Sequence, residues 1–297
     1  MIPIASIIVD TLIRGAFYVL ISASLALLFG IISVASFMQG DFCMLGGYVA
    51  FFALVSVVHV DPVLAVILSG VAMFLVGALI EKSLLRPLRR ISGKLWMFNT
   101  FVLTLGISQV MENGAQAAFG PAFLGVSSLW PGVVDIAGVS FSYDRLILLV
   151  ASVGIMLLLW AYLKFTRLGR AIRATGINEQ AVPLFGVNVN RIYLYTLGLS
   201  GLLAGVAGAF YMAIFTTYPL MGTVMNLKAW IVVLIAGLGN VKGAVVCSFL
   251  LAFIETLSIY ALSSGWQNVI GTVAVILVLL FKPTGLFGTE VKGIWEK

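Results

Sequence analysis

The sequence predicts an all-α membrane protein, a polytopic helical bundle of about eight spans with broken or re-entrant segments. Two values of its composition carry this prediction: 62% of the 297 residues are hydrophobic and only 9% are charged, against about a quarter charged in soluble domains. A soluble chain of this composition lacks the polar surface to cover its core, so most side chains must face lipid or other helices. The long continuous apolar runs exclude a β-barrel, whose strands alternate in polarity.

The apolar segments leave little room for anything besides membrane spans of about 20 residues each. We therefore treat residues 1–297 as a single transmembrane domain. This excludes a built-in ATPase, a dinucleotide-binding domain and a nucleic-acid-binding domain. The expected spans run from about Thr11 to Ala35, Met44 to Val60, Pro62 to Leu84, Trp96 to Ala118, Leu146 to Leu163, Tyr193 to Phe215, Trp230 to Leu262 and Val269 to Phe281.

Basic residues predict the orientation, because cytoplasmic loops carry an excess of Lys and Arg. Ten of the 17 basic residues gather in two short regions that two spans separate. These are Lys82, Arg86, Arg89, Arg90 and Lys94, and then Lys164, Arg167, Arg170, Arg173 and Arg191. We expect both regions in the cytoplasm, with the N-terminus and the segment from Phe119 to Tyr143 outside. The side of the C-terminus stays open, because it depends on how Trp230 to Leu262 is folded.

Two polar, glycine-containing breaks interrupt the apolar segments, at Ser36 to Asp41 and at Gly237 to Gly243. Non-helical backbone at membrane depth survives only where it faces protein or water, and discontinuous helices mark the pathways of transporters. We therefore predict that the breaks border a substrate pathway, with Ser36, Gln39, Gly40, Gly237, Gly239 and Asn240 as its candidate residues. The second break has two open interpretations, the end of a half-helix that enters the membrane or a tight turn between two helices.

Small residues predict where helices pack closely. Gly198, Gly201, Gly205 and Gly208 are spaced three, four and three apart and share one helical face. Such faces let backbones approach each other in lipid. We interpret this one as a packing seam.

Few residues could carry chemistry. Glu112 and Glu255 lie within apolar segments, where an ionisable group is costly unless it is paired or hydrated; a packing role is favoured over a proton or cation site, because each acid is solitary in its segment. The chain has two cysteines and one histidine, too few for a catalytic triad or a zinc site. It also lacks a phosphate-binding loop. We expect no enzyme activity, no catalytic or metal-binding residue and no cofactor in this chain.

The most informative polar stretch is the expected cytoplasmic loop at about 164–191. Asn178 is suited to begin a short amphipathic helix, Glu179 to occupy its first turn and Gly186 to end it. A short helix on the inner side is typical of a docking element. The alternative is a solvated linker.

Four ordered blocks resemble a known family. They are Gly15–Phe52, Thr166–Arg191, Leu227–Glu255 and the ending LLFKPTGLFG at Leu279–Gly288. The chain is similar in these blocks to branched-chain amino acid ABC transporter permeases, the LivH and LivM type of membrane subunit, and closer to LivH. It departs from the family at Ser36 and Gln39, where Asn and His are usual, and at Val182 and Pro183 in the loop.

The resemblance implies a multi-pass permease subunit in the cell membrane of a bacterium, which forms half of a pore for a small solute, most often a branched-chain or other amino acid. It implies a second permease subunit, an extracytoplasmic solute-binding protein and two cytoplasmic ATPase subunits, which bind the ATP. It places ATPase coupling in the loop, at Arg173, Glu179, Ala181 and Gly186. The alternative from another class is a secondary carrier or channel driven by an ion gradient; it predicts intramembrane acids and inverted repeats and leaves the loop unexplained.

Overall fold

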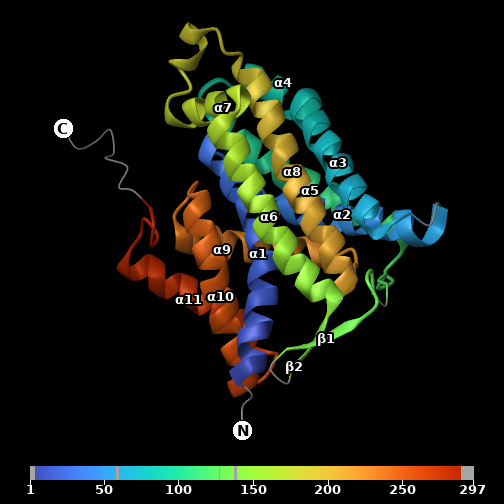
Figure 1. Cartoon of the computed structure of the whole chain (residues 1–297). Coiled ribbons are helices and arrows are strands. Elements are labelled where there is room, and N and C mark those ends of the chain that lie inside the picture. Colours follow the sequence, from blue (N-terminus) through green and yellow to red (C-terminus); the bar gives the residue numbers. More distant parts are fainter. Residues whose placement is uncertain (1–3, 58–59, 127, 137–138, 289–297) are drawn as a thin grey trace.

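The computed structural model describes residues 4–57, 60–126, 128–136 and 139–288, and the described chain forms a bundle of helices (Figure 1). Five helical stretches are long and apolar enough to cross a membrane, which confirms the all-α membrane class. They are α1 (Ile4–Ile32), the continuous stretch Pro62–Ser92, α6 (Tyr143–Phe165), α8 (Val189–Ile214) and α10 (Val241–Ala261).

Shorter or less apolar helices complete the bundle. Three apolar helices are shorter than a typical span: α2 (Gln39–Phe52), α9 (Met221–Ala236) and α11 (Trp266–Phe281). The 24-residue α5 (Trp96–Phe119) is long enough but less apolar. The stretch Pro62–Ser92 consists of α3 (Pro62–Ile80), a π-helical turn (Glu81–Leu85) and α4 (Arg86–Ser92). The remaining elements are π-helical Ala53–Val57, 3₁₀ Gly93–Leu95, α7 (Arg167–Ile177), 3₁₀ Val182–Phe185, and strands β1 (Val133–Ile136) and β2 (Val139–Ser142).

The structure corrects two expected boundaries. The segment from Trp230 to Leu262 is two helices, and the first of them, α9, begins nine residues earlier at Met221. The expected helix from Asn178 to Gly186 is only a turn followed by one 3₁₀ turn. The amphipathic helix of this loop is α7, which precedes it. Pro183 explains this result, because its ring lacks an N–H and limits continuation of an α-helix.

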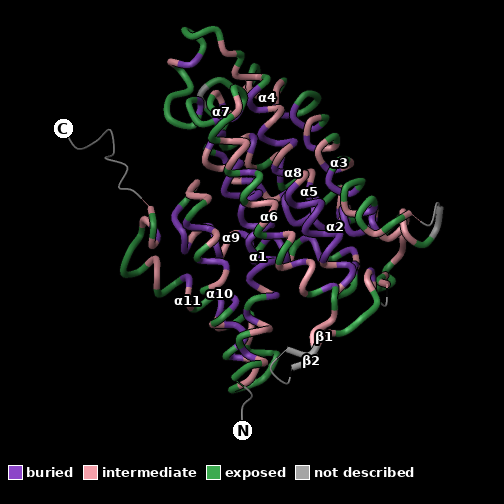
Figure 2. Tube along the Cα trace, viewed as in Figure 1, coloured by how far each residue is buried: buried purple, intermediate pink, exposed green. Residues whose placement is uncertain are grey.

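Helices α1 and α8 form the centre of the bundle. Of the most apolar 18-residue window, 89% is buried in α1 and 78% in α8, against 17% in α6. Figure 2 shows the same pattern, with buried residues along α1 and α8 and exposed residues along α6 and α11. Helix α1 packs against α8 and α10, and α8 packs against α2 and α3. The outer faces of α3, α5, α6 and α11 present leucine, valine, isoleucine and phenylalanine, as lipid-facing surfaces do.

The two ends of the bundle differ in charge. Helices α4 and α7, which carry the two basic regions, lie at one end, whereas the N-terminal end of α1 and the β1–β2 hairpin lie at the other (Figure 1). In the hairpin Val133 pairs with Ser142 and Ile136 with Val139. This arrangement agrees with two basic regions that share the cytoplasmic side.

The glycine face of α8 is a packing seam, as predicted. A Cβ on Gly201 or Gly208 would overlap the backbone carbonyl of Met73 on α3 or of Cys43 on α2. Close backbone approach also lets one hydroxyl join three helices: Ser69 Oγ of α3 lies 2.8 Å from the carbonyl oxygen of Gly46 and 2.7 Å from that of Gly205. The seam therefore fixes α2 and α3 against α8.

A methyl group tests this seam. We expect Gly208→Ala to lower the free energy of unfolding by about 1–3 kcal/mol, because overpacking forces the α2 and α8 backbones apart. The measurement is thermal unfolding of the detergent-purified chain. Gly106→Ala on α5 is the matched control, since nothing lies within 4 Å of the added Cβ. Equal stability of the two variants would contradict a tight α2–α8 contact.

Candidate functional site

The first break separates α1 from α2 and is buried. Helix α1 ends at Ile32, and Ser33 has a φ of 55°, which turns the chain out of helical geometry. Ser36 is buried, and its Oγ accepts a hydrogen bond from the Met38 amide at 3.4 Å. The break is shifted from its predicted position, since the non-helical residues are 33–38 and Gln39, Gly40 and Asp41 already belong to the first turn of α2. Gln39 Nε2 donates to Ser200 Oγ of α8 at 3.1 Å.

The second break is a tight turn between α9 and α10. Gly237 (φ 98°) and Gly239 (φ 80°) occupy left-handed conformations that side chains disfavour. Asn240 is the N-cap of α10, since its Oδ1 accepts from the Gly243 amide at 2.9 Å. Its Nδ2 donates to the carbonyl oxygen of Phe287 at 2.9 Å. The Asn240 side chain thus stabilises the turn through one hydrogen bond to α10 and one to the C-terminal segment.

The C-terminal segment Lys282–Gly288 caps α9. The Leu286 amide donates to the Ile235 carbonyl at 2.7 Å, and the Phe287 amide donates to the Ala236 carbonyl at 3.0 Å. The last carbonyls of a helix have no partner within it, and this segment supplies the missing donors. The segment Lys282–Gly288 therefore has a structural role, which is to cap the C-terminal end of the short helix α9.

Each break lies against a helix that borders the other break. The Trp230 indole Nε1 of α9 donates to the Ser36 carbonyl oxygen at 3.2 Å, and its rings stack on Phe37 with 5.6 Å between centroids. Near the inner end, a Cβ on Gly30 of α1 would lie 2.8 Å from the Gly239 carbonyl oxygen. These two contacts join segments that lie about 200 residues apart in the chain.

Buried acceptors without partners lie where α2 faces α9. A Cβ on Gly40 would overlap the backbone of Gly222 and Asn226, so these two helices touch. Both Asp41 carboxylate oxygens and Asn226 Oδ1 are buried and make no hydrogen bond of ordinary geometry with a described residue, although the Ser108 side chain of α5 lies close to the Asp41 carboxylate. A buried carboxylate without a partner is costly, so Asp41 stands ready to accept a donor. The candidate set from the sequence stopped one residue short of Asp41.

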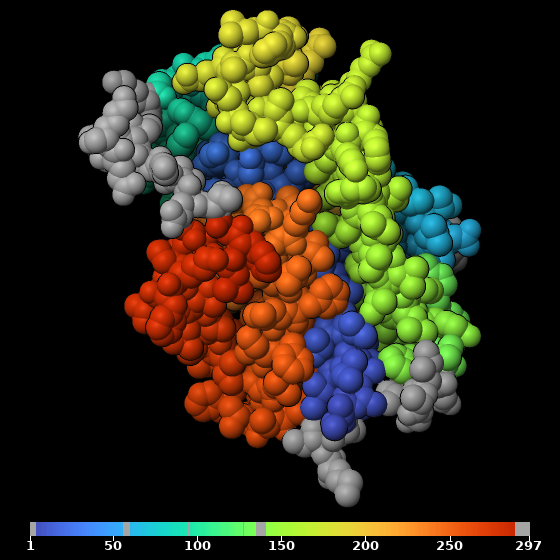
Figure 3. Space-filling model, turned by 60° about the vertical axis from the view of Figure 1, so that its left-hand side comes forward, coloured from blue at the N-terminus to red at the C-terminus, as the bar shows by residue number. Residues whose placement is uncertain are grey.

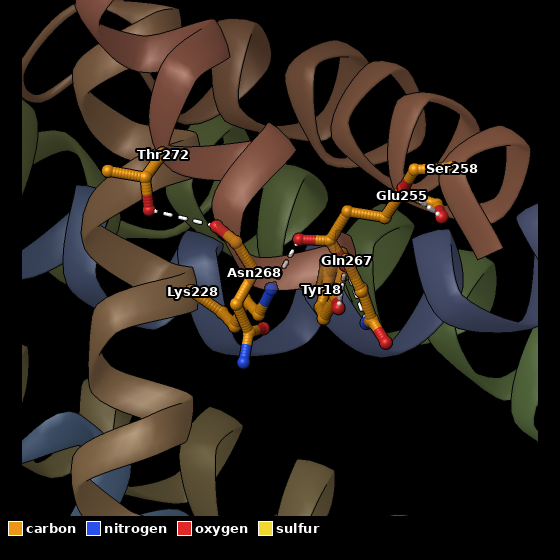
Figure 4. A network of polar contacts seen from close by, with 7 residues as sticks. All are labelled: Tyr18, Lys228, Glu255, Ser258, Gln267, Asn268 and Thr272. Carbon is orange, nitrogen blue, oxygen red and sulfur yellow. Dashed lines mark hydrogen bonds and ion pairs between the residues drawn. The ribbon is translucent and has the colours of Figure 1, made fainter. Parts of the chain in front are cut away.

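Two other acids have partners. Glu112 of α5, near Asp41, accepts from Thr223 Oγ1 at 3.1 Å. Glu255 of α10 forms an ion pair with Lys228 of α9. Its other oxygen accepts from Tyr18 of α1 at 2.7 Å and from Gln267 of α11 at 2.8 Å (Figure 4). The packing interpretation of Glu255 gains a physical reason, since the pair joins four helices. Lys228 was missed, although a lysine within an apolar run is itself the signal that could have found it.

The coupling candidates occupy the inner end of the bundle. Asn178 Oδ1 accepts from the amides of Gln180 and Ala181, at 3.0 and 3.1 Å, and closes the turn that contains Glu179. Gly186 ends the 3₁₀ turn with a φ of 76°.

The exposed side chains of this loop are apolar as well as charged. Glu179 is exposed. Next to it Leu184 is 85% and Phe185 83% exposed, an apolar pair at the tip of a loop on the basic side. Arg173 of α7 lies instead at the rim of a groove, together with Gly239 and Asn240.

Residues 7–281 match the family described as branched-chain amino acid transport system permease component. The chain belongs to this family. It is therefore a multi-pass permease of an ATP-binding cassette importer in the cell membrane, and the interpretation as an ion-driven carrier is set aside. The family is one of transport permeases and not of enzymes.

Similarities to individual branched-chain amino acid permeases span nearly the whole chain. BraD of Pseudomonas aeruginosa, a high-affinity branched-chain amino acid permease, is 28% identical over 95% of this chain and 94% of its own length. LivH of Escherichia coli K12 is 27% identical over 92% of each chain. The ribose import permease RbsC of Escherichia coli K12 is 34% identical over 42% of each chain. No solved structure matches the permease.

The buried ion pair gives a testable property of this permease. Glu255→Gln keeps the size of the side chain but leaves the Lys228 ammonium unpaired, and we expect it to cost about 3–5 kcal/mol of stability. The double variant Lys228→Met with Glu255→Gln removes both charges and should recover most of that loss. The measurement is the unfolding midpoint of the detergent-purified chain. A double variant no better than Glu255→Gln alone would contradict a charge-paired network.

Proposed function

We propose that this chain forms half of the translocation pathway for an amino acid, with the solute passing beside the two breaks. The observation that carries the proposal is the unpartnered Asp41 carboxylate between α2 and α9. Carboxylate and amide oxygens accept hydrogen bonds from an ammonium group, and the Asn226 carbonyl lies on the facing helix. Ser36, Gln39, Gly40, Gly237, Gly239 and Asn240 are the proposed pathway residues of the two breaks.

The solute class rests on this chemistry and on the relatives. BraD and LivH are named for branched-chain amino acids, whereas RbsC is named for ribose. The negative charge of a buried carboxylate favours a solute with an ammonium group over a neutral sugar. Asp41 is fully buried, so the solute reaches it only when α2 and α9 separate. The Gly40 and Gly222 contact is where that separation has to occur.

The free energy for separating α2 and α9 comes from other subunits of the transporter. Two cytoplasmic ATPase subunits bind ATP, a second permease completes the pore, and an extracytoplasmic binding protein delivers the solute. Arg173, Glu179, Ala181 and Gly186 are the proposed coupling residues, and Leu184 and Phe185 supply an apolar contact beside them. Large exposed apolar side chains next to basic residues fit a protein partner, since interface cores are apolar with a polar rim.

The ammonium contact predicts a selective loss of uptake. We expect Asp41→Asn to lower ATP-driven amino acid uptake about tenfold or more, because a hydrogen bond to a charged group contributes about 1.5–3 kcal/mol. Assembly with the ATPase subunits should be unchanged, as Asn has the same shape. Radiolabelled uptake into proteoliposomes measures the first quantity and co-purification the second.

Asp10→Asn is the matched control for this test, since Asp10 lies far from the breaks, bonded to Tyr260 at 2.9 Å. It should keep uptake within about twofold, because exposed charge pairs contribute little. Unchanged uptake in Asp41→Asn, or loss of assembly together with uptake, would leave the pathway proposal without support.

The apolar loop tip predicts the docking contact. The double variant Leu184→Asp with Phe185→Asp should lower the amount of ATPase subunit that co-purifies with the chain about tenfold or more. The reason is that hot-spot contacts contribute about 2 kcal/mol or more each. The chain itself should stay folded, since both side chains are exposed. Phe123→Asp, a change at an exposed residue before the hairpin, is the control. Normal co-purification of the double variant would place docking elsewhere.

A further inference from the structure

A long groove on the flank of the bundle shares Gly239 and Asn240 with the second break, and Asp41 is not among the residues that line it. Its volume is about 1070 Å³, at the upper end of the about 300–1,000 Å³ of small-molecule sites. Figure 3 shows it between α6 and α10, with α1 at its floor and α7 above it. Ser152 lies in its deeper part but bonds to the Leu149 carbonyl of its own helix, so the deep walls offer apolar contacts.

Positive charge gathers at one end of the groove. Lys164 lies in the last turn of α6, Arg173 lies on α7 and Lys242 lies in the first turn of α10. All three line the groove, and none of the lining residues that the structure describes is acidic. None of the three forms an ion pair in the described part of the chain. The N-terminus of α10, at the same rim, adds the positive end of a 21-residue helix. This rim is suited to a phosphate group.

Helix α7 and the turn before α10 meet at Gly30 of α1, which places the rim at the inner end. A Cβ on Gly176 of α7 would lie 2.7 Å from the Gly30 carbonyl oxygen, and a Cβ on Gly239, next to α10, would lie 2.8 Å from the Gly30 Cα. Trp160 lies beside the rim, and the Lys164 ammonium lies over its ring, 4.6 Å from the centroid. Tryptophan at the edge of a span is typical of headgroup depth.

The length of the groove matches one leaflet. Along α1 its lining runs from Gly30 to Val19, about 16 Å at about 1.5 Å per residue. The hydrocarbon core of a bilayer is about 30 Å thick, so one leaflet is about 15 Å. A helix of a partner permease would instead need a surface that runs across the whole membrane.

The geometry points to a binding site for an anionic phospholipid of the inner leaflet. Its phosphate lies among Lys164, Arg173 and Lys242, and an acyl chain follows Ala26, Met156 and Phe249. The lipid joins α6, α7 and α10 and so contacts both the coupling loop and the second break. The site does not depend on which solute the permease carries.

Native mass spectrometry of the assembled transporter tests this site. The probes are phosphatidylglycerol and phosphatidylcholine with identical acyl chains, added to the delipidated complex. We expect the complex to retain phosphatidylglycerol in preference to phosphatidylcholine. Lys164→Gln with Lys242→Gln should lower phosphatidylglycerol retention about tenfold. The matched control is Lys82→Gln with Arg90→Gln, which removes the same charge on the same side but outside the groove, and should leave retention unchanged.

A second variant tests the apolar wall with all charges kept. Val153 on α6 is 50% exposed and lines the groove, so Val153→Trp fills the space without disturbing the core and should lower retention of both lipids. Equal retention of the two lipids by the unaltered transporter, or full retention by either groove variant, would overturn the assignment. Lipid held by the isolated chain but absent from the assembled transporter would show that the partner permease covers the groove, and would also overturn it.

Discussion

Backbone groups that leave helical geometry within a membrane must find partners inside the protein, because lipid offers none. In this permease the requirement falls on the two breaks. The Ser36 carbonyl receives the Trp230 indole, and the end of α9 receives amides from the C-terminal segment 282–288. Asn240 caps α10 and reaches the same segment. These contacts connect α1, α9, α10 and the chain ending, so the short α9 depends on all of them for its place.

Charge and packing then position α9 against its neighbours. The buried Lys228–Glu255 ion pair joins α9 to α10. Tyr18 and Gln267 donate the remaining hydrogen bonds to the Glu255 carboxylate. Every oxygen of Glu255 is satisfied there, whereas Asp41, on the other side of α9, makes no hydrogen bond of ordinary geometry with a described residue. The contrast separates two uses of a buried acid. One carboxylate holds helices together, and the other is free for a solute whose ammonium group arrives and leaves.

Periodicity and charge made much of this fold predictable. The centres of the spans, the glycine seam of α8, the two breaks and the basic regions follow from local sequence. The start of α9 at Met221 did not, because Lys228 divides its apolar run and its partner Glu255 is brought near only by tertiary packing. The loop helix was placed too late: α7 has the amphipathic pattern, and Pro183 limits α-helix formation in the residues after α7. Leu184 and Phe185 were missed because exposure of an apolar residue is a property of the folded loop.

The central claim is that the breaks border a pathway which opens during transport. The most direct measurement is thiol labelling of Ser36→Cys in the assembled transporter, with the buried Cys43 and Cys247 replaced by alanine and Phe123→Cys as an accessible control. Ser36 is 1% exposed, so the account predicts no labelling at rest, labelling during ATP-driven uptake and slower labelling at saturating solute. A thiol at position 36 that stays unreactive while the transporter turns over and Phe123→Cys is labelled would contradict it.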